Sequence, residues 1–283
     1  MMNSTGKRMS EERRELISAA LLIAPAVALG VLAMILHGLS PALWGQQIAA
    51  WAAFALLAWP AKRAAARISA RVWSVLLLLF LAASLMGQEA GGARRWVNLG
   101  IVHANAAHLV LPALLTVLCR VKNPLPALLG AAAILSFQPD LMQMTAFLAA
   151  SAPLLRRLED KQLWGSILIL GLLAVRCLNA PTALEPVSYC EGILDILAQT
   201  LPLLKTIGWV ALAAVPVILL IGFAEEGERR LLSVAIYYAV SILFAASGES
   251  PVLFMGFGLS PIAGYYLAYV CHGAAERPDI STD

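Results

Sequence analysis

The chain has 283 residues, of which 60% are hydrophobic and 13% are charged. This composition excludes a soluble globular domain and indicates a membrane protein with several spans, because the few charges lie in short clusters between long apolar runs. The net charge of +3 comes mostly from these loop clusters, so it does not indicate nucleic-acid binding.

The apolar runs predict an all-α fold, a polytopic α-helical membrane protein with about ten transmembrane helices. The first run follows Lys7, Arg8, Arg13 and Arg14, as the core of a secretory signal would, but it reaches His37 without a small-residue cleavage site. We therefore expect a retained span. In chain order the predicted spans are residues 16–37, 41–60, 72–87, 104–119, 124–138, 140–154, 163–180, 203–223, 231–246 and 251–271.

Clusters of basic residues predict the orientation, because cytoplasmic loops carry most of the lysine and arginine of membrane proteins. The clusters are the N-terminal arm, Lys62/Arg63/Arg67/Arg71, Arg120/Lys122, Arg156/Arg157/Lys161 and Arg229/Arg230. We expect one transmembrane domain over residues 1–283, with a cytoplasmic arm 1–15, an extracytoplasmic loop 181–202 and a cytoplasmic tail 272–283. Both termini are thus predicted to be cytoplasmic.

Residues 91–100, GGARRWVNLG, then lie outside, although positive charge is usually scarce there. A planar guanidinium binds phosphate bidentately, so Arg94 and Arg95 beside Trp96 are suited to holding the pyrophosphate of a lipid carrier. The alternative is that both arginines reach ordinary lipid phosphates while Trp96 anchors the chain at the interface.

The stretch 124–154 resembles a single long helix, but basic residues flank both of its ends. It must therefore cross an even number of times and turn back near Gln138-Pro139-Asp140. Each half spans roughly 22 Å, which is short for a bilayer core of about 30 Å. Short proline-interrupted halves that meet at an amide and a carboxylate are typical of a polar cavity. The alternative is a solvated turn at the outer surface.

The loop 181–202 is the longest outer segment and is rich in acids. After Pro186 we predict a helix with Ser188 as N-cap, Glu191 three residues on, and Asp195 one turn further on the same face. Glu191 could act as a general base on a lipid-linked substrate. The alternative is a capping box on a surface helix, with Asp195 solvated.

No metal site is predicted. The four cysteines, Cys119, Cys177, Cys190 and Cys271, lack metal-ligand spacing. The polar residues near span ends are more often fillers than ligands: His37, His103, His108, Arg176 and Lys205. Small residues in 248–266, including Ser260, favour close helix packing.

In order along the chain, these segments resemble the SEDS family, the RodA/FtsW/SpoVE-type proteins of bacterial elongation, division and sporulation. The resemblance rests on four motifs. G-x-R-R-W-x-x-L-G is found at Gly92 to Gly100 and Q-P-D-L at Gln138 to Leu141, whereas the family's outer-loop aspartate falls on Glu191 and its P-F-x-S-Y-G-G-S motif falls on Leu253 to Ser260. The resemblance covers nearly the whole chain.

The resemblance implies a peptidoglycan glycosyltransferase of the bacterial cytoplasmic (inner) membrane. Its substrate would be lipid II, the undecaprenyl-linked disaccharide peptide, and its partner a class B penicillin-binding protein. No cofactor is certain, although a divalent cation is compatible with the family. Glu191 is the candidate catalytic residue. The candidate substrate-binding residues are Arg94, Arg95, Trp96, Asn98, His108, Gln138, Asp140, Asp195 and Ser260.

The chain also departs from the family. Asn105-Ala106-Ala107-His108 replaces Q-P-S-E, and Leu111 replaces a lysine, so a charge pair is lost. Glu191 is one methylene longer than aspartate, and the outer loop is short. One alternative is a catalytically degenerate scaffold or lipid-linked glycan binder that partners a penicillin-binding protein. A second is a lipid flippase or transporter, suggested by the short paired spans.

Overall fold

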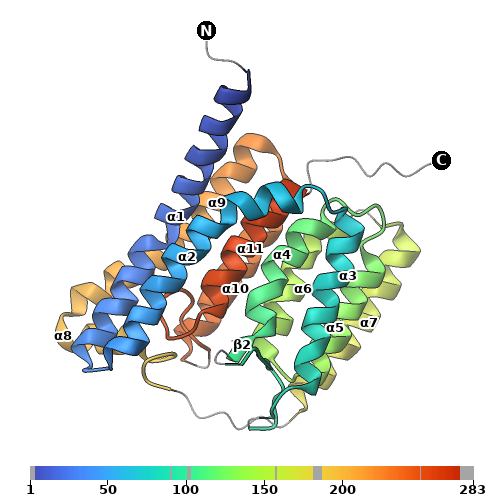
Figure 1. Cartoon of the computed structure of the whole chain (residues 1–283). Coiled ribbons are helices and arrows are strands. Elements are labelled where there is room, and N and C mark those ends of the chain that lie inside the picture. The colour runs from blue at the N-terminus through green and yellow to red at the C-terminus, as the bar shows by residue number, and fades with distance from the viewer. Residues whose placement is uncertain are drawn as a thin grey trace.

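The computed structural model describes residues 4–89, 91–100, 103–156, 158–180, 187–248 and 250–274. These residues form eleven α-helices, one 3-10 helix (η1) and one two-stranded sheet. The predicted all-α fold is confirmed, with a small β-hairpin added (Figure 1). In chain order the elements are α1 (Ser4–Leu36), α2 (Pro41–Ala65), α3 (Ala70–Ala83), η1 (Ser84–Met86), β1 (Trp96–Asn98), β2 (His103–Asn105), α4 (Ala106–Leu118), α5 (Leu125–Phe137), α6 (Leu141–Leu155), α7 (Asp160–Leu178), α8 (Ile193–Thr200), α9 (Pro202–Glu226), α10 (Arg229–Ala246) and α11 (Ser260–Ala274).

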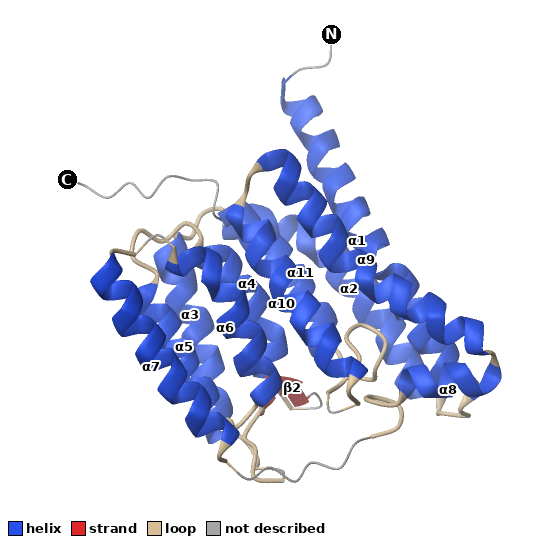
Figure 2. Cartoon of the chain, turned by 180° about the vertical axis from the view of Figure 1, so that it is seen from behind, coloured by secondary structure: helices blue, strands red, loops and turns tan. Residues whose placement is uncertain are grey.

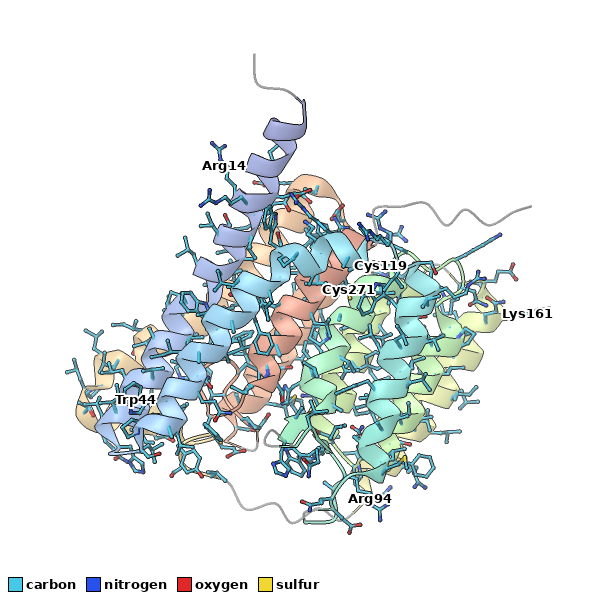
Figure 3. All side chains as sticks on the ribbon, viewed as in Figure 1. Arg14, Trp44, Arg94, Cys119, Lys161 and Cys271 are labelled. Atoms are coloured by element: carbon cyan, nitrogen blue, oxygen red, sulfur yellow. The ribbon has the colours of Figure 1, made fainter. Side chains whose placement is uncertain are left out.

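The long helices run up and down between two ends of the molecule (Figures 1 and 2). We call one end the hairpin end: it holds η1, β1, β2, the α5–α6 turn, residues 187–200 and the α10–α11 connection 250–259. The opposite end is the basic end. Figure 3 places Arg14 and Lys161 at the basic end and Arg94 at the hairpin end. The sequence predicts that successive helices alternate in direction and bring the basic clusters to one end. The up-and-down arrangement of the helices agrees with this prediction.

The predicted break of 124–154 into two helices is confirmed. α5 ends at Phe137, and α6 begins after Asp140, whose carboxylate accepts a hydrogen bond from the Gln143 backbone N–H at 3.2 Å. An aspartate at this position stabilises a helix start, because it satisfies a backbone N–H that has no partner within the helix. The turn itself lies at the hairpin end.

Two predicted boundaries are wrong. The last helix begins at Ser260, not at residue 251, and most of residues 250–259 form a buried irregular segment. The first helix begins at Ser4, so the described part of the predicted arm is helical. Several predicted features lie outside the described residues: Arg157, residues 181–186 with Pro186, and the tail from residue 275.

α4 forms the centre of the protein, packed against α3, α10 and α11. Every residue of α4 except Leu109 is buried. A Cβ atom at Gly264 of α11 would collide with the His108 carbonyl oxygen, so glycine allows the two helices to touch there.

The helix surfaces suit a lipid environment. Four helices are long and apolar enough to cross a membrane, at residues 11–36, 160–178, 202–226 and 229–246, and shorter apolar helices accompany them. Many of their outward-facing side chains are apolar: Leu168 and Leu172 on α7 are 65% and 63% exposed. Such a surface is stable only when hydrocarbon covers it.

Candidate functional site

The segment after η1 folds as a short hairpin on the start of α4. Trp96 of β1 pairs with Asn105 of β2, and the Ala106 N–H donates to the Arg95 carbonyl oxygen at 3.0 Å. Asn105 also caps α4, because its side chain accepts a hydrogen bond from the His108 N–H at 3.1 Å. Trp96 is half-buried, whereas Asn98 is exposed and its side chain accepts from the Gly100 N–H.

Arg95 turns inward to the α5–α6 turn. Its Nε lies 3.2 Å from Asp140 Oδ2, and its Nη2 donates to the Pro139 carbonyl oxygen at 2.9 Å. The Nε–Oδ2 contact is an ion pair without hydrogen-bond alignment. The side chains are 18% and 5% exposed, so this is a largely buried ion pair that joins two of the motif segments.

Arg94 turns away from its neighbour. Its Nε and Nη2 each lie 3.1 Å from Glu89 Oε2, and its Nη1 donates to the Leu85 carbonyl oxygen. The side chain of Arg94 is 51% exposed. Arg94 and Arg95 therefore engage different partners, and the structure does not bring the two guanidinium groups together on one.

A buried hydrogen-bonded chain continues inward from Asp140. Gln143 Nε2 lies 3.1 Å from Nδ1 and 3.0 Å from Nε2 of His108, and the Tyr237 hydroxyl donates to Gln143 Oε1 at 2.6 Å. Because an amide nitrogen only donates, the His108 nitrogen that accepts is unprotonated. Thus His108 lies in a buried network of neutral side chains.

Gln138 closes the same turn from the other side. Its side-chain nitrogen donates to the Leu81 carbonyl oxygen at 3.3 Å and to the Ser84 hydroxyl oxygen. Gln138 is fully buried, and these bonds attach the α5–α6 turn to the end of α3. The Gln-Pro-Asp motif therefore fixes the junction of α3, α5 and α6.

Glu191 lies in a tight turn, 187–192, that packs on the α10–α11 connection. Glu191 Oε2 accepts a hydrogen bond from the Val187 N–H at 2.7 Å. The Val252 N–H donates to the Cys190 carbonyl oxygen, and the Phe257 N–H to that of Tyr189. The acidic turn and the fourth motif segment are thus joined by backbone hydrogen bonds.

The predicted helix start at Ser188 is wrong. α8 begins at Ile193 with Gly192 before it, and Glu191 binds the N–H of Val187 and not that of Ser188. Glu191 and Asp195 therefore do not share a helix face. Asp195 instead pairs with Lys205 of α9 at 2.6 Å on the surface.

Cys190 in the same turn has a half-buried free thiol. Its thiol donates to the Phe257 carbonyl oxygen at 3.3 Å. Burial, and to a lesser degree the charge of Glu191, raise the pKa of this thiol to about 12. The thiol therefore stays protonated at neutral pH and serves packing.

Ser260 connects the last motif segment to the hairpin. Its hydroxyl oxygen accepts a hydrogen bond from the Asn105 N–H at 2.8 Å. Through this bond, the hairpin and the ion pair, the four motif segments form one connected region at the hairpin end. Within the described residues, no three His, Cys, Asp or Glu side chains gather as metal ligands.

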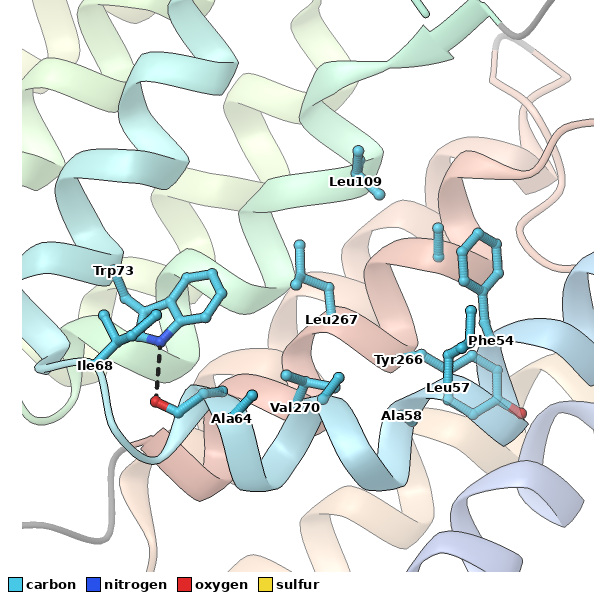
Figure 4. A pocket seen from close by; sticks show the side chains of 13 residues that line it. Phe54, Leu57, Ala58, Ala64, Ile68, Trp73, Leu109, Tyr266, Leu267 and Val270 are labelled. Atoms are coloured by element: carbon cyan, nitrogen blue, oxygen red, sulfur yellow. Dashed lines mark hydrogen bonds between the residues drawn. The ribbon is translucent and has the colours of Figure 1, made fainter.

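An apolar crevice opens between α2, α3, α4 and α11 (Figure 4). It has a cavity volume of about 420 Å³, and Phe54, Trp73, Leu109 and Leu267 are among the side chains that line it. Trp73 of α3 donates from its indole to the Ala65 carbonyl oxygen at 3.3 Å and closes one end. The lining suits a hydrocarbon chain.

Sequence reasoning missed three polar residues of this region: Gln47, Gln143 and Tyr237. Gln47 of α2 is fully buried and donates to the carbonyl oxygens of Phe254 and Gly256 at 3.1 and 3.2 Å. These two hydrogen bonds stabilise the strained backbone of Phe254, whose φ is +64°. An amide inside an apolar helix is costly without a partner, and that signal could have identified both glutamines.

Comparison with known proteins identifies the fold. No protein-family model matches the sequence, and no curated protein matches it. Solved structures match the chain in fold, with TM-scores of 0.50 to 0.58. The rod shape determining protein RodA of Thermus thermophilus, with one aspartate replaced by alanine, is 20% identical, covers 92% of this chain and 98% of its own, and has a TM-score of 0.58. The unmutated RodA is 19% identical, the match covers 92% of this chain and 97% of RodA, and the TM-score is 0.50. A chain of a peptidoglycan synthase complex that coordinates polymerization and crosslinking is 19% identical. That match covers 92% of this chain and 98% of the other, with a TM-score of 0.56.

The chain therefore has the RodA fold over nearly its whole length. The resemblance drawn from the four sequence motifs is confirmed at the level of the fold. The fold alone does not define the chemistry of a site.

Proposed function

We propose that this chain is a divergent member of the SEDS family that polymerises peptidoglycan strands at the outer face of the bacterial cytoplasmic membrane. One observation carries the proposal: four motif segments, far apart in sequence, are connected by hydrogen bonds and an ion pair at one end of a RodA fold. Packing of apolar helices does not by itself require polar side chains from these segments to meet at that end.

The hairpin end is proposed to be extracytoplasmic. Arg14 and Lys161, from two of the basic clusters, lie at the opposite end (Figure 3), where the cytoplasm would retain them. This orientation places Glu191, Arg95 and Asp140 on the outer side, where lipid-linked precursors of the wall are consumed. The inner membrane location and both cytoplasmic termini follow from the same assignment.

The proposed substrate is lipid II, and the apolar crevice beside α2 is a site for its undecaprenyl chain. The crevice is lined by α4 and α11, the two helices that also carry His108 and Ser260. A polyprenyl chain in this crevice would bring its headgroup toward the hairpin end. Trp96, Asn98 and Gln138 belong to the motif segments proposed to surround that headgroup.

Glu191 is proposed as the general base. It removes the proton from the acceptor sugar hydroxyl as that oxygen forms a bond to the anomeric carbon of the donor, and the lipid pyrophosphate leaves with the electrons of the broken bond. The bond from the Val187 N–H holds Oε2, while Oε1 receives no hydrogen bond among the described residues. A class B penicillin-binding protein is the proposed partner.

A non-catalytic role is the second candidate, and one observation favours it. His108, which stands at the position of the family glutamate, forms a neutral network with Gln143 and Tyr237, and Leu111 stands at the position of the family lysine. A protein of this kind would bind a lipid-linked glycan or a penicillin-binding protein without turnover.

The test measures glycan strands formed from lipid II by the detergent-purified chain, with any partner that co-purifies. We expect polymer from the wild type, none from Glu191→Gln, and polymer from Glu191→Asp, which restores the family carboxylate. Glu159→Gln, the same change on an exposed residue at the basic end, is the matched control. No polymer from any form, with lipid II still bound, would favour the non-catalytic role. Movement of labelled lipid II across vesicles without polymer would favour a flippase.

A further inference from the structure

A second hollow, with a partly polar lining, lies at the hairpin end beside the connected motif region. It has a volume of about 280 Å³ and lies between the end of α3 with η1, the end of α5 and the end of α7. Its charged lining residues are Glu89, Arg94 and Arg176. Arg94 and Pro139 of the motif segments line it, but Arg95, Asp140 and Glu191 do not, so the hollow adjoins the proposed glycan site without containing its charged residues.

The hollow carries a surplus of positive charge. Arg94 is partly neutralised by Glu89 at 3.1 Å. Arg176 stacks over the ring of Phe137, with 4.1 Å from its guanidinium carbon to the ring centroid, and no carboxylate pairs with it among the described residues. Two guanidinium groups against one carboxylate leave one net positive charge, which matches a single phosphodiester.

The helices that border the hollow carry exposed apolar side chains. On α7, Leu172, Val175 and Leu178 are 63%, 53% and 60% exposed, and Leu79 of α3 is 62% exposed. Phe137 at the rim is 55% exposed. A ligand bound here would therefore contact the arginines at the helix ends and the exposed apolar side chains along the helices.

We infer that this hollow binds the phosphate group of an anionic membrane phospholipid, with its acyl chains along α3 and α7. The positive charge of the hollow complements the phosphate of a phospholipid, and the exposed apolar surface along the helices complements its acyl chains. A free anion would use the charge alone. Arg94 is thereby assigned to a structural lipid, whereas Arg95, its neighbour in the same motif, pairs with Asp140. The site does not depend on the glycosyltransferase proposal.

Binding of phosphatidylglycerol to the detergent-purified full chain, measured by native mass spectrometry, tests the inference. The double variant Arg94→Gln/Arg176→Gln is expected to weaken the tightest binding event by roughly fivefold for each arginine removed. Glu89→Gln, an exposed change that leaves both arginines in place, is expected to tighten binding. Arg13→Gln/Arg14→Gln removes the same charge from exposed positions at the basic end and should leave this event unchanged.

Three further results would overturn the inference. The first is equal phosphatidylglycerol affinity in the wild type and the Arg94/Arg176 double variant. The second is displacement of the lipid by millimolar inorganic phosphate, which would make the hollow a site for a free anion. The third is displacement by undecaprenyl pyrophosphate at a lower concentration than that of phosphatidylglycerol, which would assign the hollow to the glycan substrate.

Discussion

Replacing Asp140 by asparagine isolates the charge of the Arg95–Asp140 pair, because asparagine keeps the shape and the helix-capping oxygen of aspartate. The two charged atoms lie 3.2 Å apart. At an effective dielectric constant of about 20, their gross attraction is roughly 5 kcal/mol, and part of it offsets the desolvation of both groups.

The two single variants are expected to differ. Arg95→Gln leaves a carboxylate that is 5% exposed without its partner. The expected loss of unfolding free energy is therefore about 3 kcal/mol. Asp140→Asn leaves a guanidinium that is 18% exposed and still bonded to the Pro139 carbonyl oxygen, so a loss of about 2 kcal/mol is expected. The double variant should cost less than the sum by about 2 kcal/mol.

The assay is reversible denaturation of the purified protein in mixed micelles, with helix content as the signal. The exposed pair Asp195–Lys205, at 2.6 Å with side chains 66% and 40% exposed, is the matched control. Its double-mutant cycle should give a coupling of at most about 1 kcal/mol, because water screens the pair. Strict additivity of Arg95→Gln and Asp140→Asn would refute the reasoning that burial makes this pair strong.

Two further predictions concern the interior. Tyr237→Phe removes the donor to Gln143 and leaves a buried amide oxygen unsatisfied, so denaturation in micelles should show a loss of about 1–3 kcal/mol. Gly264→Ala pushes a methyl group into the His108 carbonyl oxygen and should lower the unfolding free energy by about 1–3 kcal/mol, whereas Gly171→Ala, on an exposed helix face, should not. Equal effects of the two glycine variants would contradict the close α4–α11 contact.

Local signals predicted the membrane helices well. The break between α5 and α6 was predicted at 138–140, where the structure has it, because a proline and flanking charges act within a few residues. Hydropathy failed for residues 250–259. They are apolar and mostly buried, but their backbone bonds go to Gln47 and to the turn 187–192, partners that no sequence window contains.

The candidate site was predictable only in part. The motif positions named Arg95, Asp140, Glu191 and Ser260, since each residue type is unusual in its apolar surroundings. The direction of each side chain was not predictable. Arg94 and Arg95 are neighbours with the same chemistry, yet one faces a surface hollow and the other a buried carboxylate.

By itself, the sequence determined a helical membrane protein with most of its basic clusters at one end, because a helix satisfies its own backbone hydrogen bonds in hydrocarbon and the charge distribution sets the direction of the helices. The tertiary structure decided which polar groups meet. Gln143 reaches His108 and Tyr237 only because α4, α6 and α10 pack together, and the Glu191 turn meets residues 252–257 only because the segments that precede α8 and α11 lie beside each other. Contacts between distant segments depend on the packing of whole helices, and local sequence does not specify that packing.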